Sequence, residues 1–198
     1  MRFLNFLKSN VAHLISAGLF LTGVVFVIVS FFVPMFNVSY FASVDSTELN
    51  QLELVATHQL GFNYFFNNFN GWLETGSAYG YSMFVQISLM ILVCLGIVFA
   101  GYIVCLIFSF LKDKISRKGE FIGASFGIVS VILSVATILL LIIILTATEI
   151  GKKAADFVYN STVRENGPAY VLLIAAAILF IVSGAINTAA ISEKIGKN

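Results

Sequence analysis

Residues 121–148 read FIGASFGIVSVILSVATILLLIIILTAT and contain no Asp, Glu, Lys or Arg. A helix needs roughly 20 apolar residues to cross a hydrocarbon core about 30 Å thick, so this stretch is long enough to span a membrane. A charge near the bilayer centre costs about 2.5 to 3.5 kcal/mol on insertion scales, which is why spanning segments lack charges. Three further stretches share both properties. They are residues 9–44, 75–111 and 166–192.

These stretches predict an all-α integral membrane protein, a four-transmembrane-helix bundle in a single membrane domain of residues 1–198. The composition agrees, because 59% of the residues are hydrophobic and 11% are charged, against about 25% charged in soluble domains. Pro34 is expected to end the first helix and Pro168 to begin the last one. The expected spans are 11–33, 83–111, 121–147 and 169–190.

The charged residues are distributed unequally between the two sides of the predicted bundle. The short loop 112–119 carries Lys112, Lys114, Arg117 and Lys118, and further Lys and Arg residues lie near both termini. The other two loops together carry seven acidic and three basic residues. Because Lys and Arg favour cytoplasmic loops, both termini are predicted to be cytoplasmic, in a plasma membrane or a bacterial inner membrane. Loops 35–81 and 148–168 then form an extracytoplasmic cap.

The large outer loop contains mixed signals for secondary structure. Residues 37–44 alternate as a short strand would. Asp45 and Glu48 have the spacing of a capping box, and Leu49, Leu52, Ala56 and Leu60 follow at helical spacing, which predicts a helix. An aromatic segment follows, either as a core packed on the helix ends or as a partner-docking surface, since aromatic clusters are common anchors. Its candidate contact residues are Phe62, Tyr64, Phe65, Phe66, Phe69 and Trp72.

Small residues form seams along the predicted spans, and such seams let membrane helices pack closely. The seams hold the monomer together or contact another subunit. The candidate packing or subunit-interface residues are Gly123, Gly127, Ser130, Ser134 and Thr137 in the third span, Ser16, Gly23 and Ser30 in the first, and Ser183 and Asn187 in the fourth.

The sequence contains no catalytic, cofactor-binding or metal-binding motif that we recognise. His13 and His58 are predicted on opposite sides of the membrane, so they cannot share a metal. Cys94 and Cys105 lie on one predicted helix, about 16 Å apart, too far to form a disulfide. We therefore expect no enzymatic activity, no cofactor, no small-molecule substrate and no nucleic acid partner.

The stretch Pro34-Met35-Phe36-Asn37-Val38-Ser39-Tyr40 resembles the start of the first outer strand in claudin-like tetraspan proteins, and Gly71-Trp72 resembles part of their loop signature. The helix layout is similar across the whole chain. The two loop cysteines of that family are absent here. The resemblance implies a shared architecture rather than a function.

Aromatic loop residues, small-residue seams and the absence of deep charges favour a non-enzymatic scaffold or accessory subunit. Its expected partners are membrane lipid and other membrane proteins, or further copies of the chain. The alternative is a channel or transporter subunit that forms a pathway only as an oligomer. In that case Gln86, Asn187 and the third-span seam would face a central axis instead of one another.

Overall fold

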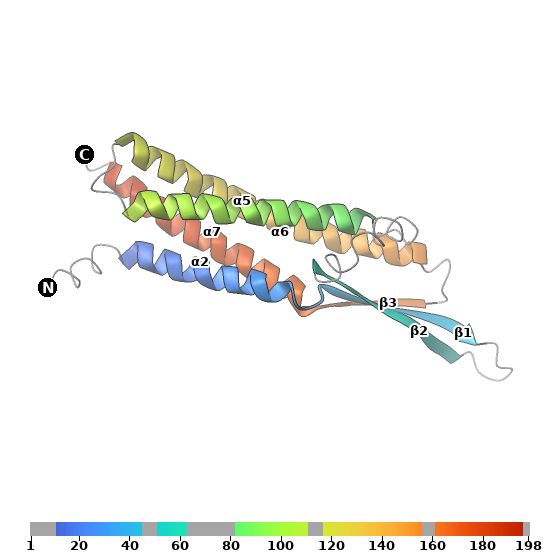
Figure 1. Cartoon of the computed structure of the whole chain (residues 1–198). Helices are drawn as coiled ribbons and strands as arrows, with labels where there is room; N and C mark the ends of the chain where they lie inside the picture. The colour runs from blue at the N-terminus through green and yellow to red at the C-terminus, as the bar shows by residue number, and fades with distance from the viewer. Residues whose placement is uncertain (1–10, 45–50, 63–81, 111–116, 156–160, 196–198) are drawn as a thin grey trace. The chain divides into compact units, whose positions relative to one another are not determined.

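The computed structural model describes residues 11–44, 51–62, 82–110, 117–155 and 161–195. They form four helices and three strands (Figure 1). The helices are α2 (Val11–Ser30), α5 (Ser82–Phe110), α6 (Arg117–Ala155) and α7 (Pro168–Ile195), and the strands are β1 (Phe36–Val44), β2 (Gln51–Leu60) and β3 (Ser161–Asn166).

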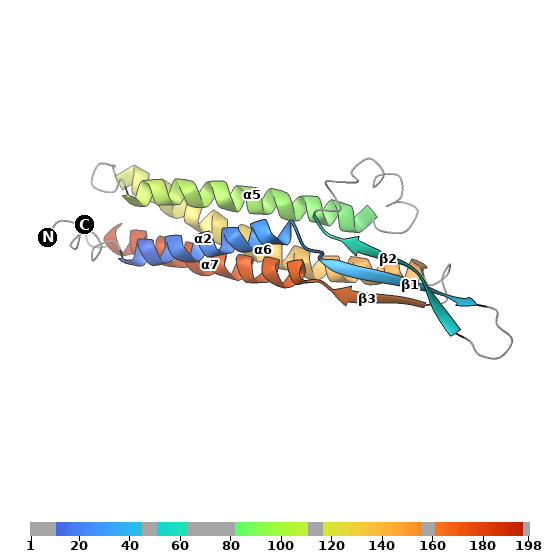
Figure 2. The same ribbon diagram turned by 60° about the horizontal axis from the view of Figure 1, so that its bottom comes forward.

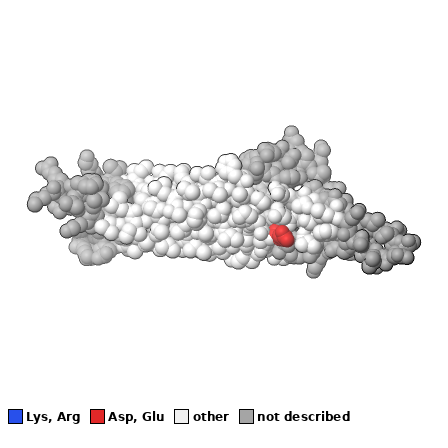
Figure 3. All heavy atoms as spheres, turned by 90° about the horizontal axis from the view of Figure 1, so that it is seen from below, with Lys and Arg blue, Asp and Glu red and all other residues white. Residues whose placement is uncertain are grey.

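The four predicted spans are confirmed as helices long and apolar enough to cross a membrane. Their apolar parts are Val11–Ser30, Gln86–Ile107, Phe121–Thr146 and Pro168–Ala189. Many large apolar side chains on all four helices are exposed, as expected of surfaces that contact lipid. Figure 3 shows the described surface of one face, which is almost free of charge. The helical bundle and the membrane location therefore hold.

Local sequence explains where the first helix, α2, ends and where the last helix, α7, begins. α2 ends at Ser30, and the amides of Phe31 and Phe32 donate to the carbonyls of Ile28 and Val29, three residues back, at 3.1 and 3.0 Å. Hydrogen bonds of this 3₁₀ type are common in the last turn of an α-helix, and Pro34 prevents α2 from continuing. α7 begins at Pro168, as predicted, where the missing amide hydrogen removes no helical bond.

Contacts within the chain define two compact units. The first comprises residues 1–26, 92–139 and 175–198, and the second comprises residues 27–91 and 140–174. In the first unit, segments of all four helices lie side by side, and α2 begins at the end where α7 finishes (Figure 2). The prediction of one membrane domain is not tested by this grouping.

The second unit contains a three-stranded antiparallel sheet with the strand order β2-β1-β3. β1 confirms the strand predicted over 37–44. Helix α6 extends past the predicted span to Ala155, and β3, from the second predicted outer loop, pairs with β1, from the first. The two loops thus form one sheet. That the sheet is extracytoplasmic remains a prediction.

The sheet has one buried and one exposed face. Phe36 and Leu60 are paired across the strands, and Val38 lies two residues from Phe36, so all three side chains share one face. This face is buried, since each of them is at most 3% exposed. The ring of Phe36 also lies 5.6 Å from that of Tyr170 at the start of α7. The opposite face carries the cross-strand hydrogen bond between Ser39 and Thr57 hydroxyls, at 3.2 Å.

The helix predicted through Leu49, Leu52, Ala56 and Leu60 is wrong, because residues 51–60 form β2. A spacing of four residues fits one helical face, but it is also an even number and fits one strand face. Pairing with β1 decides between them, and that pairing is not local. Leu49 and the capping residues Asp45 and Glu48 lie outside the described residues.

A β-bulge interrupts β2. Tyr40 pairs with Ala56 and Phe41 pairs with Leu54, so Val55 is the additional residue. The bulge places Leu54 on the same face as Thr57, although their separation of three residues would put them on opposite faces of a regular strand.

Residues Pro34 and Met35 join the helices to the sheet. The Met35 amide donates to the Leu60 carbonyl at 2.8 Å, and the Met35 carbonyl accepts from the Gly167 amide at 2.7 Å. The Pro34 carbonyl accepts from the Ala169 amide at 3.1 Å. Two residues thus connect the end of α2 to the end of β2 and to the start of α7.

Candidate functional site: a buried polar cluster among the helices

A chain of three polar side chains crosses the interior of the first unit. The ring nitrogen Nδ1 of His13 on α2 donates to Oδ1 of Asn187 on α7 at 2.5 Å. Nδ2 of Asn187 then donates to Sγ of Cys105 on α5 at 3.1 Å. All three side chains are at most 2% exposed. A buried amide without partners would be costly in hydrocarbon, and here both its oxygen and its nitrogen are bonded.

A second set of hydroxyl groups lies beside this chain. The Ser16 hydroxyl on α2 donates to the backbone carbonyl of Ser183 on α7 at 2.8 Å, and its oxygen also pairs with the hydroxyl of Tyr102 on α5. Ser16 and His13 are three residues apart on α2, while Tyr102 and Cys105 are three apart on α5. Residues at this spacing share a helical face. Helices α2 and α5 therefore each present one polar face to Ser183 and Asn187 of α7.

Aromatic packing holds the Tyr102 ring in place. The Phe20 ring stacks on that of Tyr102, with centroids 3.8 Å apart and planes 8° apart, and also contacts Phe180 at 5.1 Å. Gly23 lies against Phe180, since a Cβ atom at Gly23 would come within 2.6 Å of the Phe180 ring. The predicted small residue Gly23 thus makes room for an aromatic side chain.

The small-residue seam that the sequence predicts on α6 packs against the cluster. Gly127 faces α5 and α7, because a Cβ atom there would meet the Thr188 hydroxyl and lie 3.3 Å from Sγ of Cys105. Ser130, Ser134 and Thr137 are at most 1% exposed. Their hydroxyls donate to carbonyls four residues back on α6 at 2.7 to 2.9 Å. The seam is thus buried within the chain and satisfies its own polar groups.

Some of the remaining predicted site residues are buried, and the others lie outside the described residues. Gly123 is buried on α6, and Ser30 is buried in the second unit, where its hydroxyl donates to Val27 at 2.6 Å. Phe62 is only 1% exposed and contacts the ring of Phe31 at 5.0 Å, so it is a core residue. The other predicted contact residues, Tyr64, Phe65, Phe66, Phe69 and Trp72, lie outside the described residues.

The sequence interpretation found Ser16, Ser183 and Asn187 but missed three members of the cluster. His13 was considered only as a metal ligand and Cys105 only as a disulfide partner, and both roles were excluded, while Tyr102 received no role. Cys105 is indeed buried and unbridged, but it also accepts a hydrogen bond. The available signal was the three-residue spacing of His13 with Ser16 and of Tyr102 with Cys105.

The geometry of the cluster suits packing better than catalysis. Asn187 lies between His13 and Cys105 in the hydrogen-bond chain, so this chain gives the imidazole no bond to the thiol through which to act as its base. Cys105 and Asn187 are both 0% exposed, which leaves a substrate no route to the sulfur. Within the part of the chain that the structure describes, no three His, Cys, Asp or Glu side chains could hold a metal together.

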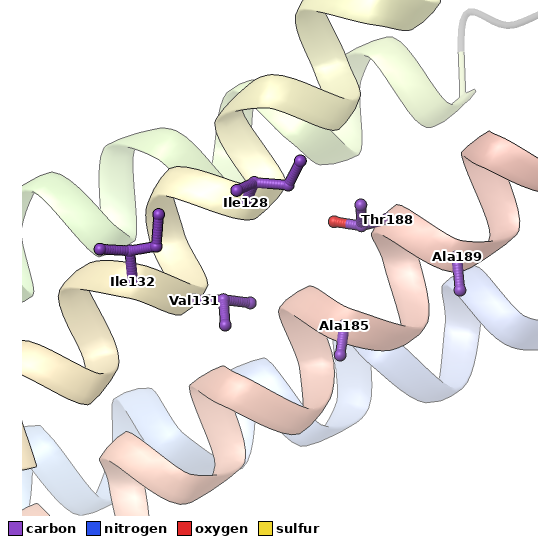
Figure 4. Close-up of a pocket in the computed structure, with 6 residues that line it drawn as sticks. All are labelled: Ile128, Val131, Ile132, Ala185, Thr188 and Ala189. Carbon is purple, nitrogen blue, oxygen red and sulfur yellow. The ribbon is translucent and has the colours of Figure 1, made fainter.

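A shallow groove of about 360 Å³ lies between α6 and α7 in the first unit (Figure 4). Its lining is almost entirely apolar. The Thr188 hydroxyl at its edge is buried and has no hydrogen-bond partner. The lining residues are Ile128, Val131, Ile132, Ala185, Thr188 and Ala189.

No protein-family model, curated protein or solved structure matches this chain. The class of protein therefore rests on the fold alone. The four apolar helices mark an integral membrane protein with a helical bundle and an attached three-stranded sheet.

Proposed function

We propose that this chain is a non-enzymatic scaffold or accessory subunit that binds other membrane proteins. The observation that carries the proposal is that both polar atoms of the Asn187 side chain are bonded inside the chain, the oxygen to His13 and the nitrogen to Cys105. Asn187 is one of the two side-chain amides within the predicted spans, the other being Gln86. It stabilises contacts between helices instead of presenting a hydrogen-bonding group to a solute.

The same reasoning weighs against the alternative, a subunit of an oligomeric channel. A pathway would need Gln86, Asn187 and the α6 seam to face a shared axis. The hydroxyls of the seam are bonded to their own helix and buried, and Asn187 has two partners. Gln86 is exposed. A channel would therefore have to be lined by other groups.

The exposed face of the sheet is the surface that we propose for partner binding. Leu54 on β2 is 57% exposed and Val163 on β3 is 44% exposed, and β1 pairing places both on the face that carries Thr57. We further propose, from the charge distribution, that this sheet is extracytoplasmic and that both termini are cytoplasmic. The claudin-like arrangement is likewise a proposal, supported by the position of Pro34 and Met35 directly before β1, whose first residues are Phe36–Tyr40.

Affinity purification tests the proposal. The chain carries a C-terminal tag, is extracted in a mild detergent, and is analysed for proteins that accompany it at a constant ratio. We expect a different membrane protein at fixed stoichiometry. A homogeneous population containing only this chain, together with ion or solute flux in liposomes, would overturn the scaffold proposal and support the channel.

Paired substitutions on the sheet test the binding surface. Leu54→Lys combined with Val163→Lys should reduce the recovered partner at least tenfold, because charges replace exposed apolar contacts. Leu54→Thr combined with Val163→Thr is the matched control, since it retains residues that favour strands. Equal recovery with both pairs, at equal thermal stability, would exclude this face as the contact surface.

A further inference from the structure

We draw no further inference here: the strongest candidate, the shallow apolar groove between α6 and α7 beside Thr188, lies on a helix face for which nothing in the structure shows what covers it.

Discussion

His13 in the first turn of α2 and Asn187 in the last third of α7 are 174 positions apart in the chain, yet their side chains are joined by a buried hydrogen bond of 2.5 Å. This bond fixes the first helix against the last. Because Asn187 also donates to Cys105, the same amide connects both helices to α5. A change at this one position should therefore affect three helices together.

Replacing Asn187 by Leu should destabilise the protein by about 1 to 2 kcal/mol, because the imidazole and the thiol both lose a partner in a buried site. The free energy of unfolding, measured by titration with a denaturing detergent, checks this value. His13→Phe is the second arm of a double-mutant cycle. We expect the double variant to be less destabilised than the sum of the single ones, and strict additivity would contradict the inferred coupling.

The two halves of the Tyr102 side chain should make separable contributions. Tyr102→Phe removes the hydroxyl that pairs with Ser16 but retains the ring stacked on Phe20, so a loss of about 1 kcal/mol is expected. Tyr102→Ala also removes the ring and should cost about 3 to 5 kcal/mol. The same detergent titration compares them. If both variants lost the same free energy, the stacking of Phe20 on Tyr102 would contribute nothing to stability.

Gly127→Ala should destabilise the first unit because the added Cβ atom would collide with the Thr188 hydroxyl. Overpacking of this kind costs about 1 to 3 kcal/mol. Thr188→Ala alone should be nearly neutral, since its hydroxyl oxygen has no partner to lose. Combined with Gly127→Ala, it should restore most of the lost stability, as read from the thermal midpoint in detergent.

Gly96→Ala is the control for the Gly127 experiment. No atom lies within 4 Å of the position that its Cβ would take. We expect a change within about 0.5 kcal/mol. A loss as large as that of Gly127→Ala would mean that alanine disturbs α5 or α6 for reasons other than close packing.

Gly167→Ala should have a larger effect on the second unit. Its Cβ atom would collide with backbone atoms of Pro34 and Met35, which cannot rotate away as a side chain can. The substitution should also weaken the bond from the Gly167 amide to the Met35 carbonyl. We expect a loss of about 3 kcal/mol, at the upper end of overpacking costs.

Limited proteolysis and thermal unfolding together check the Gly167 prediction. Cleavage within residues 161–166 should become faster if β3 separates from β1. Gly18→Ala is the matched control, because its Cβ would meet no atom within 4 Å. An unchanged cleavage rate and midpoint in Gly167→Ala would show that the Pro34–Met35 junction tolerates displacement.

The four helices, the end of the first and the start of the last could be predicted from the sequence because they depend on short-range properties. Hydrocarbon requires an uninterrupted helix of apolar residues, and Pro34 and Pro168 restrict the backbone at their own positions. The seam on α6 could also be proposed as a packing surface from the sequence, since small residues spaced by three and four share a face. The sequence could not distinguish packing within the chain from packing between chains, and burial of Ser130, Ser134 and Thr137 favours the former.

The sheet and the polar cluster required the tertiary structure. Residues 51–60 have a pattern compatible with a helix or a strand, and only their pairing with β1 and the bulge at Val55 select the strand and its register. His13, Tyr102, Cys105 and Asn187 come from three helices, and no local pattern states which helices are neighbours or how each is rotated. The sequence by itself determined which segments enter the membrane, because that depends on the transfer of each segment from water to lipid. The tertiary structure decided which polar groups meet, because a hydrogen bond depends on the positions of two atoms that the chain brings together only when it folds.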